Sequence, residues 1–270
     1  MKIIEGGVCA AQGFTASGIH CGIRKNKSKR DLALIYSDVK ATCASVYTTN
    51  KVKGAPLTVT KNNIADGYAQ AVICNSGNAN TCNANGIEIA EKTCQLIASQ
   101  LNISPLDVVV ASTGVIGQPL DITPIKEGIP SLVSALGNNS EEAAEGIMTT
   151  DTRLKQIAVS FEVGGVECKI GGIAKGSGMI HPNMATMLVF ITTDCNISAP
   201  MLQKALSSDI KKTFNMVSVD GDTSTNDMVT VMANGKAGNA QITCEGADFD
   251  AFMKKFKAGL AVQRLAAEVL

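Results

Sequence analysis

Residues 175–188, with the sequence KGSGMIHPNMATML, are the run of this chain whose residue types could do chemistry. Thr186 follows a small residue, Ala185, and precedes an apolar run. If the chain breaks between Ala185 and Thr186, Thr186 gains a free α-amine, whose pKa of about 7.7–8.0 leaves part of it unprotonated at neutral pH. That amine can take the proton of the threonine hydroxyl. The run therefore predicts self-cleavage and a nucleophile that needs no histidine, against the alternative of a loop that enters a buried strand.

A second run, residues 111–117 with the sequence ASTGVIG, ends a predicted buried strand. A small hydroxyl residue and glycines at such a strand end can aim O–H and N–H donors at an oxyanion. Taken by itself, the run also fits an ordinary turn from strand to loop.

Three further features indicate little on their own. Residues 148–155 (MTTDTRLK) read as a polar loop before a strand, and Lys175, beside three small residues, reads as a surface lysine with little side-chain cover. Residues 219–227 (VDGDTSTND) suggest a turn or, weakly, a cation-binding loop, and the missing later bidentate glutamate argues against calcium. We expect this last run to pack against the nucleophile's strand and assign none of its residues a chemical role.

Together these runs resemble motifs of the bifunctional ornithine acetyltransferase/N-acetylglutamate synthase family, the ArgJ family. The matching motifs are Gly-Ser-Gly-Met-Ile-x-Pro-Asn-Met-Ala-Thr-Met-Leu, Ser-Thr-Gly-Val-Ile-Gly, Thr-Thr-Asp-Thr and Asp-Gly-Asp-Thr-Ser-Thr-Asn-Asp. They occur in family order, and the resemblance extends from the N-terminal region to about Asn234. It implies cleavage between Ala185 and Thr186, with Thr186 as nucleophile.

The same resemblance assigns the remaining site residues. Thr113 and Gly114 are implied to form the oxyanion hole, Thr152 to line the substrate site, and Lys175 to contact the substrate carboxylate. No residue is implied to bind a metal.

The resemblance also implies a fold and a reaction. The fold is α/β, a layered α-β-β-α sandwich of the ArgJ/DmpA-like type with mixed sheets. The reaction moves an acetyl group from N2-acetylornithine to L-glutamate through an acyl-Thr186 intermediate, in the cyclic pathway of arginine biosynthesis. No cofactor is needed, and acetyl-CoA is a second donor only in bifunctional members. The cleaved α and β fragments are expected to assemble as an α2β2 heterotetramer.

Two departures from the family leave alternatives open. His181 stands where the family often has alanine, and its role is undefined. A substrate-binding glutamate in an Asp-Gly-Glu-Gly-Ala-Thr motif, and an asparagine and a serine or threonine beyond it, have no counterpart. The last residues, 265–270, form an amphipathic pattern without a capping glycine. We expect the C-terminal region of the family to be absent, so the chain could instead be a catalytically silent member or an N-terminal-nucleophile, aminopeptidase-like hydrolase.

Composition narrows the class of protein. The chain has 270 residues, 45% of them hydrophobic, which fits a single large α/β domain over residues 1–270. Its 24 lysines and arginines balance 24 aspartates and glutamates, so the charge gives no argument for binding nucleic acid. Nine cysteines without Cys-x-x-Cys spacing and only two histidines argue against zinc. No signal-peptide core and no membrane-length apolar run are present, so we expect a cytoplasmic protein.

Apolar periodicity predicts alternating strands and helices. Val163 and Val166 flank Gly164-Gly165, a two-residue hairpin signal. Helices are predicted at residues 87–101, from Ser198 to about residue 214, and near the C-terminus on a stripe that runs from Phe252. The predicted strands are residues 31–36, 71–74, 108–111, 157–163, 166–173, 188–193 and 228–233.

Overall fold

The computed structural model of the chain describes residues 2–176, 187–210 and 224–256. Within these ranges the strands form one mixed sheet with the order β1-β6-β7-β8-β9-β3-β4-β5, and β2 pairs with β3 beside this path. The strands are β1 Lys2–Ile4, β2 Phe14–Ile19, β3 Leu32–Tyr47, β4 Tyr68–Asn78, β5 Val108–Val115, β6 Lys155–Val163, β7 Val166–Lys175, β8 Leu188–Thr193 and β9 Met228–Ala233.

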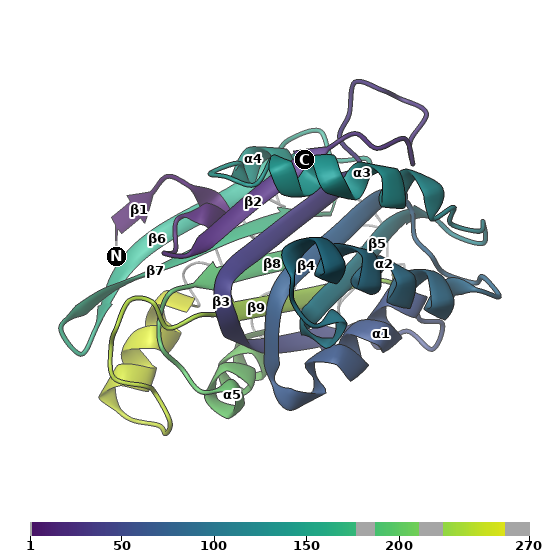
Figure 1. Ribbon diagram of the computed structural model, residues 1–270. Coiled ribbons are helices and arrows are strands. Elements are labelled where there is room, and N and C mark those ends of the chain that lie inside the picture. The colour runs from purple at the N-terminus through teal and green to yellow at the C-terminus, as the bar shows by residue number, and fades with distance from the viewer. Residues whose placement is uncertain (1, 177–186, 211–223, 257–270) are drawn as a thin grey trace.

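Helices connect and cover these strands. The α-helices are α1 Ala55–Asn63, α2 Gly86–Leu101, α3 Thr123–Ser134, α4 Ser140–Ile147 and α5 Ala199–Ile210, and residues 247–256 are also helical. Short 3-10 turns lie at Gly7–Cys9, Ile64–Asp66 and Pro105–Asp107. Figure 1 shows α1, α2 and α3 gathered on the side of β4 and β5, and α5 apart from them beneath β3 and β9.

The long strand β3 divides the sheet into two layers. Its first part, through Ser37, pairs with β2, and β4 pairs with it as far as Thr42, whereas its last part, from Thr42 to Tyr47, pairs with β9. The register with β4 shifts between Tyr36 and Ala41, and such a bulge bends a strand and increases its twist. One continuous strand therefore belongs to both layers.

Three hydrophobic cores define the layering. The middle core lies between the two sheet parts and takes alternate residues from each, such as Ile35 and Cys74 from one and Leu188 and Phe190 from the other. A second core packs the opposite face of β3, β4 and β5 against α2 and α3. The third packs the outer face of β6 to β9 against α5 and the helical residues 247–256. This is the α-β-β-α order that the family resemblance implies, and the prediction of fold class is confirmed.

Several local predictions are also confirmed. Gly164 and Gly165 have φ of +56° and +81° and form the turn of the β6–β7 hairpin, which ends in the pair Val163–Val166. Phe252 and Phe256 are fully buried, with stacked rings whose centroids lie 5.4 Å apart. The last residues of the helix predicted from Ser198 to about residue 214, and those of the helix predicted near the C-terminus, lie outside the described residues.

All nine cysteines lie in the described parts of the chain, and all are free thiols. Across these same residues no helix is long and apolar enough to cross a lipid bilayer. No group of three or more histidine, cysteine or acidic side chains is arranged to hold a metal ion within the described ranges.

Candidate active site

Lys175 and Thr113 meet inside the sandwich. Lys175 is the last residue of β7, Thr113 lies near the end of β5, and they are 62 positions apart. The Lys175 Nζ donates a hydrogen bond to the Thr113 Oγ1 at 3.1 Å. Lys175 is only 2% exposed and Thr113 only 5% exposed. Two residues that the sequence singled out in separate motifs therefore form one buried polar pair.

The ammonium group of Lys175 prepares the Thr113 hydroxyl as a donor. An ammonium has only donors, so Thr113 Oγ1 must accept in this pair, and its own hydrogen remains free for another acceptor. Burial lowers the pKa of Lys175, against the opposing effects of the Asp151 and Asp227 charges. A cation behind a hydroxyl in a dry interior polarises the O–H bond, so Thr113 suits stabilisation of a developing oxyanion.

Gly114 follows Thr113 in β5 and lies directly against β4. It pairs with Gly77 in the parallel β4–β5 register and has φ of +134°, a conformation that favours glycine. A Cβ at position 114 would lie 2.3 Å from the backbone carbon of Gly77. The exposed Gly114 backbone is thus fixed beside the buried Thr113 hydroxyl.

Residues Ala185 and Thr186, the predicted cleavage pair, lie outside the described residues, and so does His181. The described chain resumes at Met187, whose N–H donates to the Asp227 Oδ1 at 2.7 Å. The Met187 carbonyl accepts a hydrogen bond from the Met228 N–H at 3.0 Å. Leu188 then pairs with Lys175 in the antiparallel β7–β8 register. Met187, the residue after Thr186, is therefore fixed by hydrogen bonds through both its N–H and its carbonyl. It directly precedes β8, which pairs with the strand that carries Lys175.

Asp227 is a buried carboxyl that the sequence motif did not identify as chemical. It is 1% exposed, and its Oδ2 has no hydrogen-bond partner within the described residues. Burial raises the pKa of Asp227 to about 7, although the Met187 N–H, the Ser224 hydroxyl and the Lys175 charge all favour ionisation. This carboxyl therefore changes charge near neutral pH, at the position that fixes the backbone after Thr186.

Replacing Asp227 with asparagine should change how stability depends on pH. A raised carboxyl pKa means that the folded protein binds more protons than the unfolded chain. The stabilisation that comes from protonated Asp227 is therefore lost as the pH rises towards the pKa of Asp227 in the folded protein. Since that value is about 7, wild type should lose about 1.5 kcal/mol relative to Asp227→Asn between about pH 5.5 and pH 7. Urea unfolding of both proteins at several pH values measures this difference. Parallel curves would contradict it.

Asp151 organises the segment that carries Thr152. Its Oδ1 accepts hydrogen bonds from the Lys155 Nζ at 2.7 Å and from the Gly176 N–H at 2.8 Å. Burial opposes ionisation of Asp151, but the Lys155 hydrogen bond, the Gly176 N–H and the nearby lysine charges outweigh it and lower its pKa. The buried pair thus fastens the chain immediately after Lys175. Thr152 itself is exposed, and its predicted role in lining the substrate site stays a prediction.

Asn226 joins three segments of the site. Its Nδ2 donates to the Ala79 carbonyl at 2.7 Å and to the Ser112 carbonyl at 2.9 Å. Its Oδ1 accepts from the hydroxyls of Thr81 and Thr225, each at 2.6 Å. The start of β9, the end of β5 and the loop after β4 are thus tied together at one side chain. The expected packing of residues 219–227 against the nucleophile's strand is met at Asp227, which accepts the Met187 N–H, whereas Asn226 binds β5 and the loop after β4.

Sequence reasoning missed Asp151, Lys155, Asn226 and Asp227 as site residues. Charged residues are rarely fully buried, so a polar run beside a strand reads as a solvated loop. The usable signal was position: Asp151 and Lys155 lie within three residues of Thr152, and Asn226 and Asp227 directly precede β9, which pairs with the strand after the predicted nucleophile.

The fold places the chain among proteins with a variant of the Ntn hydrolase fold. An L-aminopeptidase D-Ala-esterase/amidase from Ochrobactrum anthropi, described as a variant of the Ntn hydrolase fold, matches 97% of this chain and 86% of its own with a TM-score of 0.54. The two sequences are only 13% identical, so this likeness concerns the fold alone. The chain has the layered architecture of that variant.

The family follows from sequence. The ArgJ family model matches residues 15–269, and the chain belongs to the ArgJ family. The arginine biosynthesis bifunctional protein ArgJ of Symbiobacterium thermophilum is 48% identical over 263 residues, which are 96% of this chain and 65% of that protein. An ornithine acetyltransferase from Mycobacterium tuberculosis, solved with ornithine, is 31% identical with a TM-score of 0.60 and covers 69% of this chain and 99% of its own. The chain thus spans just under two thirds of that curated relative's length.

Proposed function

We propose that this chain is the nucleophile-bearing part of a glutamate N-acetyltransferase that moves an acetyl group from N2-acetylornithine to L-glutamate. The observation that carries the proposal is the buried contact of Lys175 with Thr113, one strand from the residues that follow Thr186. Acyl transfer requires a polarised donor that stabilises the oxyanion formed when a nucleophile attacks, and Thr113 with Lys175 behind it can supply that donor.

The reaction proceeds through two tetrahedral intermediates. After cleavage between Ala185 and Thr186, the Thr186 hydroxyl attacks the acetyl carbonyl of N2-acetylornithine and gives its proton to the Thr186 α-amine. Thr113 and Gly114 donate hydrogen bonds to the oxyanion. The C–N bond then breaks, the leaving amine of ornithine takes that proton, and the acetyl group remains as an ester on Thr186. The amine of glutamate attacks this ester, and its proton returns through the α-amine to the threonine oxygen.

Two findings on relatives support this proposal. The solved relative carries the name ornithine acetyltransferase and was crystallised with ornithine. The match covers 99% of the solved relative but only 69% of this chain, so the solved relative is the shorter of the two. The curated relative is longer than this chain, which covers 65% of it. A solved chain shorter than the whole protein is consistent with cleavage in the region of residue 186.

The remaining parts of the proposal derive from the family. We infer that the chain acts in arginine biosynthesis in the cytoplasm, without a required cofactor, and that acetyl-CoA is a second acetyl donor only if the complete protein is bifunctional. Cleavage would give α and β fragments that assemble as an α2β2 heterotetramer.

Thr186→Ala is expected to abolish self-cleavage, whereas Thr186→Ser should retain it, because serine keeps a hydroxyl at the same position. Wild type should give fragments 1–185 and 186–270 on a denaturing gel. Intact-mass measurement after incubation with N2-acetylornithine should then show one acetyl group on the 186–270 fragment. Cleavage that persists in Thr186→Ala would reject Thr186 as nucleophile. Cleavage without acetylation would favour the silent member, and release of free acetate without transfer to glutamate would favour a hydrolase.

A further inference from the structure

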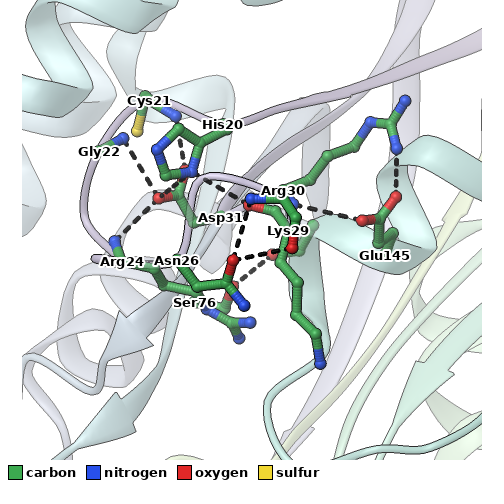
Figure 2. Close-up of polar contacts among 12 residues, drawn as sticks. His20, Cys21, Gly22, Arg24, Asn26, Lys29, Arg30, Asp31, Ser76 and Glu145 are labelled. Atoms are coloured by element: carbon green, nitrogen blue, oxygen red, sulfur yellow. Dashed lines mark hydrogen bonds and ion pairs between the residues drawn. The ribbon is translucent and has the colours of Figure 1, made fainter.

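The loop of residues 20–31 is held by one buried carboxylate. Asp31 is fully buried, and its carboxylate accepts hydrogen bonds from the backbone N–H groups of Cys21, Gly22 and Arg24, at 2.6, 3.2 and 2.9 Å. Figure 2 shows these groups converging on Asp31. The Asp31 carbonyl also accepts from the Ser76 N–H at 2.9 Å, which fastens the loop to β4. The backbone of Arg24 is therefore fixed relative to the strand that carries Gly77.

Arg24 lies between the oxyanion strand and the Thr152 segment. A Cβ added to Gly77 would lie 2.9 Å from the Arg24 Cγ, so the side-chain stem passes over Gly77, which pairs with Gly114. At the other end, the guanidinium Nη2 donates to the Met148 carbonyl, just before the motif that contains Thr152. Arg24 thus joins the two segments that border the predicted site.

The charge of Arg24 has no counterion among the described residues. The acids that act on it electrostatically are Asp31, Asp151 and Glu145. Asp31 is occupied by three backbone N–H groups, Asp151 is paired with Lys155, and Glu145 is paired with Arg30. Arg24 is half-buried, and this burial lowers its pKa, so its charge is partly desolvated. A guanidinium that spends one donor on a carbonyl retains others in a planar fork suited to a carboxylate.

Lys175, to which the family resemblance assigns a substrate carboxylate, is a second cation near this position. Its Nζ is enclosed and donates to Thr113, whereas the Arg24 guanidinium is half-buried. We propose that Arg24 is a substrate-binding residue that holds a carboxylate of the acetyl donor or acceptor at the edge of the oxyanion strand. This inference rests on the proposed function for the identity of the ligand. The carboxylate could be the one that N2-acetylornithine and N-acetylglutamate share, or the side-chain carboxylate of N-acetylglutamate.

Calorimetric binding of three ligands to the 270-residue chain tests the proposal. N2-acetylornithine carries one carboxylate, N-acetylglutamate two and N-acetylputrescine none. Arg24→Met, which keeps a stem over Gly77, should weaken binding of the carboxylate-bearing ligands by about 10- to 100-fold and leave N-acetylputrescine unchanged. Arg24→Lys should restore part of the loss. A loss confined to N-acetylglutamate would identify the side-chain carboxylate.

Arg30→Met is the matched control, because Arg30 is in the same loop and its guanidinium is paired with Glu145. It should leave all three affinities unchanged, and thermal midpoints show whether each variant is folded. Equal weakening of all ligands by Arg24→Met, no weakening, or no measurable binding by wild type would overturn the inference. Acetylation of Thr186 is a separate readout, so loss of carboxylate discrimination in an acetylating protein rejects only the role of Arg24.

Discussion

Replacing Asp151 with asparagine is expected to lower the free energy of unfolding by about 3–5 kcal/mol, the usual cost of breaking a buried ion pair from one side. Asparagine keeps the size of the side chain and one acceptor oxygen. It removes the negative charge, however, and leaves the ammonium of Lys155, which is 5% exposed, without compensation. The same change weakens the hold on Gly176 and therefore on the end of β7. Urea unfolding followed by circular dichroism measures the loss.

The exposed pair of Asp38 and Lys236 provides the control. Its side chains are 48% and 36% exposed, so Asp38→Asn should change stability by less than about 1 kcal/mol. The double variant Asp151→Asn with Lys155→Met removes both charges and should recover much of the loss, because no unpaired ion is then buried. If the Asp151 and Asp38 variants lose similar amounts, the buried pair does not contribute as we expect.

Gly114→Ala is expected to destabilise the protein by about 2–6 kcal/mol, the sum of typical costs for backbone strain and for overpacking. The new Cβ would lie 2.3 Å from the Gly77 carbon and 2.6 Å from the Asn78 nitrogen, both backbone atoms within the sheet. Such atoms cannot yield as a side chain can. Relief requires separation of β4 from β5, which also displaces the Thr113 hydroxyl. Denaturant unfolding gives the stability, and intact-mass analysis gives the rate of Thr186 acetylation.

Gly117→Ala is the control that distinguishes the cost of backbone strain from the cost of a steric clash. Gly117 is in the same motif and has φ of +79°, but an added Cβ would meet nothing within 4 Å. It should therefore cost only about 1–2 kcal/mol, from the left-handed backbone alone. A Gly114→Ala variant as stable as Gly117→Ala would mean that the two strands can separate freely at this point.

The candidate oxyanion residues were identified by resemblance. Thr113 and Gly114 lie at the end of an apolar run, but that run by itself also fits an ordinary turn from strand to loop. The contact of Thr113 with Lys175 was not predictable, because it depends on the register of strands far apart in sequence. The buried charges of Asp151 and Asp227 were missed for a related reason. A sequence shows that a residue is charged, but whether the side chain is buried depends on how the sheet layers and loops pack around it.

The fold was predictable to a similar extent. Apolar runs of strand length indicated strands at residues 157–163, 188–193 and 228–233, and the last two are buried on both faces. The strand predicted at residues 31–36 continues to Tyr47 in the structure. The prediction ended too early because Asp38 and Lys40, which lie at the bulge, interrupt the apolar run. The helices α1, α3 and α4 were missed, and α3 contains Pro130, which is atypical of a helix interior. The role of β3 in both layers has no sequence signal, because it comes from pairing with partners on each side.

The position of β8 and β9 in the sheet order constrains how the chain could be divided. Both strands lie between β7 and β3, so the part of the chain after residue 186 is inserted into the middle of a sheet whose two flanks come from the part before it. Taking out this insert would create two unpaired strand edges, one along β7 and one along β3, and exposed edges invite aggregation. A cut before residue 186 would therefore be tolerated only after the sheet has closed, and the two pieces would stay joined by backbone pairing without a covalent link.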